Sequence, residues 1–173
     1  MRLVILGRDG VINRIKEGGI RSPEDWSPLP GSLEAIARLN HVGYKVAVAT
    51  EQPDLRDGRL DLDTLNAIHG RFHQLLGRVG GHVDALLVCP HGPDDASDCM
   101  ETKPALYQDI CDRFSMTPSR IPVISDGPDD LLAAQQVGAE PLLVGEKSDT
   151  PEPRFPCFDD LSQAVEHLLN RSS

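Results

Sequence analysis

Short apolar runs alternate with helix-like patterns along this chain, and that alternation limits the folds that it can adopt. The runs are rich in Val, Ile, Leu and Ala, and between them apolar residues recur at the spacing of an amphipathic helix. The predicted strands are 3–6, 44–50, 83–89, 121–125 and 141–144, and the predicted helices are 32–39, 62–79, 104–114, 128–137 and 159–170. Strands that alternate with helices predict an α/β fold with a central parallel sheet.

The predicted strands are almost wholly apolar, as in sheets whose two faces are both covered by helices. We therefore expect a three-layer sandwich in one domain over residues 1–173, with its ligand site beyond the carboxyl ends of the strands. Segments 14–30 and 92–102 are predicted as loop inserts, and 146–154 as a flexible loop. The first insert contains Trp26, which fits either a substrate lid or simple packing.

The chain carries a net charge of −10, which argues against binding to nucleic acid or to an anionic membrane surface. It has no apolar stretch near the roughly 20 residues that a membrane span needs, and its N-terminal apolar run is short for a signal peptide. We expect a cytoplasmic protein. A small phosphorylated ligand stays compatible with the acidic balance, because a metal ion and one or two placed cations can bind phosphate.

The predicted strand ends bring together residues suited to phosphate chemistry. Gly7 and Asp9 follow the first strand, Thr50 ends the second, Asp126 follows the fourth, and Lys103 precedes a helix. Carboxylate oxygens are the ligands that Mg²⁺ prefers, while hydroxyl and ammonium groups hold phosphate oxygens. Each residue alone is equally compatible with a helix cap or a solvated surface, but their joint placement favours a Mg²⁺-assisted phosphate site.

Five short motifs at these strand ends resemble those of the haloacid dehalogenase superfamily of phosphatases. They are "RDGVIN", "VATEQ", "CPHGPDD", "TKP" and "SDGPDDLLAA". The resemblance runs from residue 1 to about 145. It is narrowest to the D-glycero-D-manno-heptose 1,7-bisphosphate phosphatases and more distant to the histidinol-phosphatase-like members. It implies a Rossmann-like fold without a large cap domain, a monomer, a small phosphorylated sugar as ligand, and a role in heptose supply for lipopolysaccharide.

The resemblance also implies a role for each matching residue. Asp9 matches the second aspartate of an Asp-x-Asp turn, the acid/base that protonates the leaving oxygen and then activates water. Thr50 and Lys103 match the residues that hold the phosphoryl oxygens. Mg²⁺ would be held at Asp9 and Asp126, with Asp130 supporting the metal site.

The chain departs from the family pattern at the same edge. The nucleophile position is occupied by Gly7, which has no attacking group, supplies no metal ligand and removes a negative charge. Glu51 replaces an asparagine and adds negative charge close to the expected phosphate, and Thr102 replaces an arginine. The resemblance therefore implies a weakened Mg²⁺ site and an inactive or strongly impaired phosphatase.

The family's zinc loop is altered as well. Cys89 and His91 match its first pair of ligands, and Cys99 matches a third, but Glu101 stands where the family has its last cysteine. Zinc accepts carboxylate oxygen, so a site with these four ligands is chemically possible, and Asp98 could compete as the oxygen donor. An equally weighted alternative is a loop with no metal and two free thiols.

Three functional hypotheses stay open from the sequence. The first is an impaired relative of the heptose bisphosphate phosphatases that keeps its phosphate ligand or Mg²⁺. The second is an active phosphomonoesterase with a non-standard nucleophile. The third is a non-enzymatic interaction or regulatory protein. A nucleotide loop at Gly7-x-x-Gly10 is disfavoured, because no helix pattern starts directly after it.

Overall fold

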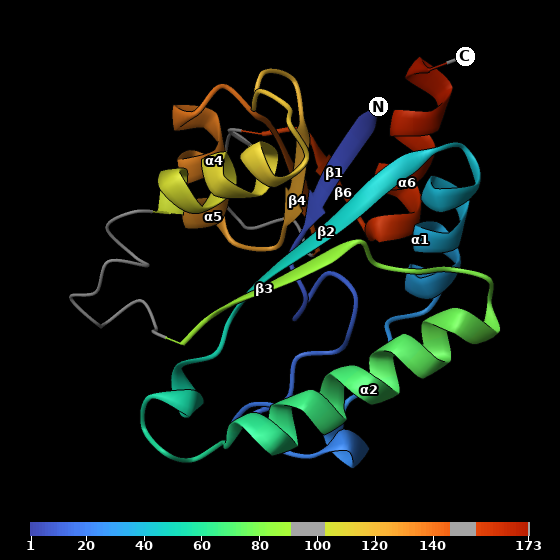
Figure 1. Ribbon diagram of the computed structural model, residues 1–173. Helices are drawn as coiled ribbons and strands as arrows, with labels where there is room; N and C mark the ends of the chain where they lie inside the picture. Colours follow the sequence, from blue (N-terminus) through green and yellow to red (C-terminus); the bar gives the residue numbers. More distant parts are fainter. Residues whose placement is uncertain (91–102, 146–154, 173) are drawn as a thin grey trace.

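The protein is a central parallel β-sheet with helices on both of its faces (Figure 1). The structure is a computed structural model, and it describes residues 1–90, 103–145 and 155–172. The strands are β1 (Arg2–Leu6), β2 (Tyr44–Glu51), β3 (Ala85–Cys89), β4 (Pro122–Ser125), β5 (Glu140–Val144) and β6 (Cys157–Phe158). The α-helices are α1 (Ser32–His41), α2 (Leu62–Arg78), α4 (Lys103–Arg113), α5 (Pro128–Gln136) and α6 (Leu161–Arg171).

The strand order is β3-β2-β1-β4-β5-β6, and every neighbouring pair is parallel. The chain moves outward from β1 to β3 and then returns to place β4 on the other side of β1. The strand order therefore reverses between β1 and β4, where Leu6 lies opposite Ile124. Ligands of open parallel sheets bind at such a reversal, beyond the carboxyl ends of the strands.

Two hydrophobic clusters hold the layers together. Helices α1, α2 and α6 cover one face of the sheet, and α4 and α5 cover the other (Figure 1). The strand side chains alternate between these clusters: in β1, Val4 and Leu6 pack under the first group of helices, and Leu3 and Ile5 pack under the second. Both faces are buried under helices, which explains why the strands are apolar throughout. The predicted three-layer α/β sandwich is confirmed.

All five predicted strands and five predicted helices are present, with boundary shifts of a few residues. The third strand begins at Ala85, because the carboxylate of Asp84 accepts the backbone N–H of Val46 at 2.8 Å in place of a strand carbonyl. Helix α4 begins at Lys103. Three short elements have no counterpart among the predicted ones: β6, which is only two residues long, and two 3₁₀ turns, η1 (Pro23–Asp25) and η2 (Pro53–Leu55).

The insert 14–30 is a packing segment at Trp26. This side chain is fully buried at the end of η1, and its ring lies 5.2 Å from the ring of Phe72 on α2. Arg71 also donates to the carbonyl oxygen of Trp26 at 3.2 Å. The structure therefore decides for packing at this residue. Segments 92–102 and 146–154 lie outside the described residues, so their predicted loops stay predictions.

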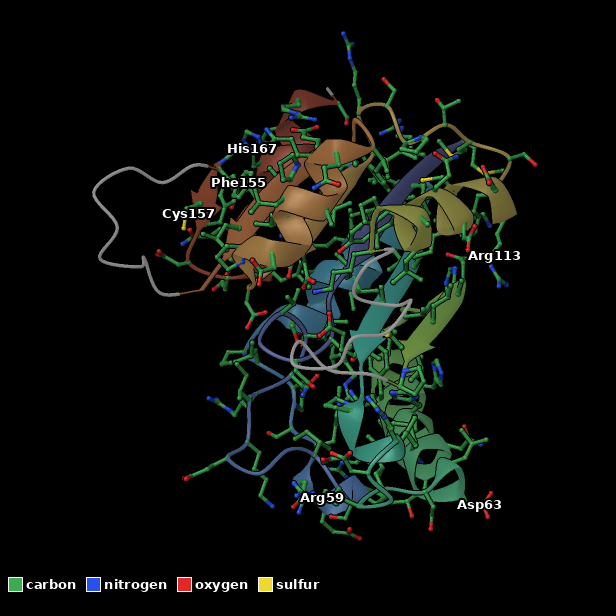
Figure 2. All side chains as sticks on the ribbon, turned by 90° about the vertical axis from the view of Figure 1, so that its left-hand side faces the viewer. Arg59, Asp63, Arg113, Phe155, Cys157 and His167 are labelled. Atoms are coloured by element: carbon green, nitrogen blue, oxygen red, sulfur yellow. The ribbon has the colours of Figure 1, made fainter. Side chains whose placement is uncertain are left out.

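The β6 edge and the start of α2 lie at opposite ends of the molecule. Figure 2 shows Phe155, Cys157 and His167 in the upper part of the molecule and Arg59 and Asp63 at its lower end. The ring of His167 lies 5.0 Å from the ring of Phe158, with the two planes tilted by 42°. None of the helices in the described ranges has the length and apolarity needed to cross a bilayer.

Candidate active site

A cavity of about 260 Å³ lies at the carboxyl edge of the sheet, where the strand order reverses. Its walls come from the ends of β1, β2, β3 and β4 and from the first turns of α4 and α5. The polar residues predicted from the sequence, Asp9, Thr50, Lys103, Asp126 and Asp130, all line it together with Gly7, Glu51 and Cys89. The topology therefore brings together residues that are more than 100 positions apart in the chain.

Gly7 continues β1 into this cavity. Its N–H donates to the carbonyl oxygen of Ile124 at 2.9 Å, so its backbone extends the pairing of β1 with β4. A Cβ atom at this position would lie 3.3 Å from a methyl group of Val11 and 3.8 Å from the hydroxyl of Ser125. A side chain fits here if the Val11 methyl moves by a few tenths of an ångström. The glycine leaves the cavity wall without a functional group at the end of β1.

The Asp9 side chain is held in one orientation by its neighbours. The guanidinium of Arg8 donates from Nε to Oδ1 at 2.8 Å and from Nη2 to Oδ2 at 3.1 Å. The amide of Asn13 donates to Oδ1 at 2.9 Å. The Asp9 side chain keeps 37% of its surface exposed, so it can still meet a ligand in the cavity. Bidentate pairing with arginine fixes the plane of the carboxylate as well as its charge.

Arg8 is almost fully buried, and its third contact is a histidine. Its Nη1 donates to Nε2 of His69 on α2 at 3.0 Å. Burial first, and then the positive charge of Arg8, lower the pKa of His69 to about 4. The imidazole is therefore neutral at pH 7, with Nε2 as the acceptor. His69 thereby supports the arginine that orients Asp9.

Thr50 presents a buried hydroxyl near the end of β2. The side-chain amide of Gln52 donates to its Oγ1 at 2.9 Å, and the Gln52 N–H donates to the carbonyl oxygen of Cys89 at 2.7 Å. Because Gln52 supplies a proton to the hydroxyl oxygen, the hydroxyl's own proton is available to an oxyanion. The predicted phosphate-binding threonine is thus placed and oriented in the cavity.

Lys103 is buried at the first turn of α4 and forms two ion pairs. Its Nζ contacts Oε1 of Glu51 and Oδ1 of Asp130, which comes from α5. Burial alone would lower the pKa of Lys103, but hydrogen bonds to Asp130 and Glu51 outweigh it and raise the pKa above its usual value. The ammonium is therefore charged at every physiological pH, and two carboxylates share it.

Asp126 follows β4 and faces the turn after β1. One of its oxygens would lie 2.1 Å from a Cβ at position 10, where Gly10 has a φ of +78°. Only glycine allows both that backbone conformation and that close approach. Burial, with smaller contributions from the charges of Asp130 and Asp9, raises the pKa of Asp126. Like charges gathered around one carboxylate of a cavity wall are typical of a cation site.

Of the predicted metal ligands, the Mg²⁺ ligands and Cys89 lie within the described residues, and the other zinc ligands do not. Within residues 1–90, 103–145 and 155–172, no group of three or more His, Cys, Asp or Glu side chains is arranged to hold a metal ion. Asp9 and Asp130 lie in the same cavity as Asp126, but both already pair with cationic side chains. Of the four predicted zinc ligands, Cys89 is buried at the end of β3, and His91, Cys99 and Glu101 lie outside the described residues.

Replacing Asp126 with asparagine is expected to raise the melting temperature of the metal-free protein at pH 8. A raised carboxyl pKa means that the folded state binds the proton more tightly than the unfolded state. Stability contributed by this group is therefore lost as pH rises from about 4, the usual pKa of aspartate, through the folded-state pKa. Thermal unfolding in EDTA at pH 4 and pH 8 checks this. A variant that melts lower than the wild type at pH 8 contradicts the expected repulsion.

The residues that orient the site are not among those predicted from the sequence. Arg8, Asn13 and Ser125 carry the second set of contacts: the Ser125 hydroxyl donates to Asp130 at 2.9 Å and accepts the Gly127 N–H at 3.1 Å. Arg8 and Asn13 stand inside the quoted motif "RDGVIN", so their proximity to Asp9 was a usable signal. His69 lies 60 residues from Asp9 in a helical pattern, and nothing in its local sequence indicates the contact.

Comparisons with known proteins find a matching family and relatives of similar sequence. The model of the haloacid dehalogenase-like hydrolase family matches residues 3–138. A D-glycero-beta-D-manno-heptose-1,7-bisphosphate 7-phosphatase of Bordetella bronchiseptica is 42% identical over 99% of this chain and 100% of its own length. The Pseudomonas putida protein of the same name is 40% identical over 98% of this chain and 100% of its own length.

Solved structures show the same likeness. The D,D-heptose 1,7-bisphosphate phosphatase of B. bronchiseptica, complexed with magnesium and phosphate, superposes with a TM-score of 0.91 at 40% identity, over 99% of each chain. The Burkholderia thailandensis enzyme of that name gives a TM-score of 0.73 at 37% identity and covers 98% of this chain and 99% of its own. The likeness spans the whole sheet and both helix layers.

Proposed function

Because this chain belongs to the haloacid dehalogenase-like hydrolase family, we propose that it is a relative of the heptose bisphosphate phosphatases that binds a phosphorylated sugar but has lost most hydrolytic activity. The observation that carries the proposal is Gly7. It stands at the end of β1, in the wall of the cavity, where the resemblance to the family implies an attacking aspartate. Without that carboxylate no aspartyl-phosphate can form, and the main catalytic step is missing.

The remaining residues support binding and proton transfer. The Thr50 hydroxyl and the Lys103 ammonium face the cavity and are suited to phosphoryl oxygens. Asp9, oriented by Arg8 and Asn13, is placed to give a proton to a leaving oxygen and to take one from water. With no nucleophile beside it, Asp9 has no covalent intermediate to resolve.

The same cavity fits a weakened Mg²⁺ site. Mg²⁺ is commonly held by one or two carboxylates and by water, and Asp126 is a carboxylate of the cavity wall under repulsion from Asp130 and Asp9 that a cation would relieve. Asp126 and the backbone carbonyl of Asp9 would hold the ion, and Asp130 would support it through Lys103 and Ser125. The bound ion would neutralise charge on the phosphoryl group. Gly7 supplies no oxygen ligand from its side chain, which weakens the site.

The proposal is tested by separating binding from turnover. With Mg²⁺, the wild-type protein is expected to hydrolyse heptose 1,7-bisphosphate or p-nitrophenyl phosphate at rates close to the buffer blank. The heptose bisphosphate is still expected to raise the melting temperature, because a ligand that binds only the folded state stabilises it. Thr50→Val, which keeps the shape and removes the hydroxyl, is expected to reduce that shift. Robust hydrolysis that disappears in Asp9→Asn would refute the loss of activity.

A further inference from the structure

Glu51 is the residue of the cavity whose position the phosphatase chemistry does not explain. It is the last residue of β2, directly after Thr50, and its backbone lies opposite Cys89 of β3. Its side chain turns into the cavity, and its Oε1 atom, shielded from solvent, faces the ammonium of Lys103. A carboxylate oxygen withdrawn from water needs a cation, so this contact fixes where the side chain points.

Lys103 has a strong need for acidic partners. It is 9% exposed, and it stands at the N-terminus of α4, where the helix dipole disfavours a positive charge. Asp130 satisfies one side of the ammonium and is itself held by the Ser125 hydroxyl at 2.9 Å. Glu51 satisfies the other side. Two carboxylates thus surround one ammonium, and the cluster carries a net negative charge.

Arg8, which also lines the described cavity, is already paired with other side chains. Its guanidinium donates hydrogen bonds to both oxygens of Asp9 and to His69. Among the residues that line the described cavity, Lys103 is therefore the group with the charge and placement to meet a phosphoryl oxygen. A phosphate must displace Glu51 from this ammonium or bind beside its negative charge.

From this arrangement we propose that Glu51 is an ionic latch: its carboxylate occupies the phosphate-binding side of Lys103 and lowers the affinity of the site for phosphate. The latch rests on the proposed phosphate-binding function. It also gives the Lys103 ammonium a second carboxylate partner beside Asp130. Phosphate and the Glu51 carboxylate compete for the same ammonium, so the strength of the Glu51–Lys103 ion pair sets the affinity of the cavity for phosphate.

The test measures the binding of inorganic phosphate by titration calorimetry in wild type, Glu51→Gln and Glu51→Ala. Glutamine keeps the size of the side chain and removes its charge, so the affinity for phosphate is expected to rise about tenfold. Lys103→Met in the Glu51→Gln background is expected to abolish that gain. Glu140→Gln is the matched control: this glutamate is similarly part-buried and pairs with Arg171 on α6, so phosphate affinity is expected to stay unchanged.

The outcomes separate the latch from the function on which it rests. Tighter phosphate binding in both Glu51 variants supports the latch, including the case in which only the variants bind. Measurable wild-type binding that is unchanged in folded Glu51→Gln and Glu51→Ala overturns the latch and leaves the proposed function standing. If no form of the protein binds phosphate, the proposed function and the latch both fail.

Melting temperatures give a second readout that needs no ligand. The loss in Glu51→Gln/Lys103→Met is expected to be smaller than the sum of the two single losses, because each single variant already breaks the same ion pair. Strictly additive losses overturn the pairing on which the latch depends.

Discussion

Gly7→Asp is expected to raise the rate of phosphate-ester hydrolysis about 100-fold over wild type in the presence of Mg²⁺. The substitution adds the attacking carboxylate at the end of β1. The backbone accepts it readily, because the tightest contact of the new Cβ is a Val11 methyl at 3.3 Å and φ does not lie in the left-handed region. Hydrolysis of heptose 1,7-bisphosphate and p-nitrophenyl phosphate, followed by phosphate release, measures the gain.

The hydrolysis rate of Gly7→Asp should stay below that of a phosphatase with all of the family's motif residues. The Glu51 carboxylate still pairs with Lys103, and the carboxylate introduced at position 7 adds to the negative charge of the cavity. Gly7→Asp/Glu51→Gln is therefore expected to exceed Gly7→Asp alone. We expect hydrolysis rates to increase from wild type to Gly7→Asp and again to Gly7→Asp/Glu51→Gln.

Two controls identify the source of any new activity. Gly7→Asn places a side chain of the same shape without a nucleophile, and it is expected to stay at the wild-type rate. Gly7→Asp/Asp9→Asn keeps the nucleophile and removes the acid/base, and it should lose most of the gain. If folded Gly7→Asp is no faster than Gly7→Asn, the missing nucleophile is not the main reason for low activity.

Arg8→Ala is expected to lower the free energy of unfolding by about 3 kcal/mol. Arg8 is 1% exposed, so its removal leaves a buried space as well as a carboxylate without its cation. Asp9 is partly exposed, and water meets some of its charge, which keeps the expected loss at the lower end for a buried ion pair. Urea denaturation at pH 7 measures the loss.

Arg71→Ala provides the matched control for this prediction. Arg71 makes one hydrogen bond to the backbone of Trp26 from an exposed position on α2, so its removal should cost under about 1 kcal/mol. Equal losses at the two arginines would show that Arg8 is not a central contact.

The same site makes stability depend on acid pH through His69. The lowered pKa of His69 means that the unfolded chain takes up a proton that the folded protein does not, between the usual value of 6.5 and about 4. The stability of the wild type should fall as pH decreases through that window. His69→Gln keeps an acceptor for Arg8 and removes the titration, and it should flatten this part of the curve.

The strand-end residues Asp9, Thr50 and Asp126 line one cavity, because parallel strands bring their carboxyl ends to the same edge. Lys103 joins them from the start of α4. The position of Gly7 in that wall was also readable from its distance to Asp9 in the turn.

The sequence by itself determined the layers of this protein. Apolar strand runs, helical periodicity and the glycines and prolines between them are local patterns, and local backbone preferences and burial act on them directly. Those patterns correctly predict β1 to β5 and all five described helices. They also predict that chemistry gathers at one edge.

Only the tertiary structure decided how the site residues pair. The contact of Glu51 with Lys103, and that of Arg8 with His69, join residues more than 50 positions apart, and no periodic pattern encodes them. Trp26 is a core residue rather than a lid because Phe72 lies beneath it. Each outcome depends on which charged or aromatic groups the fold brings within contact distance, since burial forces every charge to find a partner.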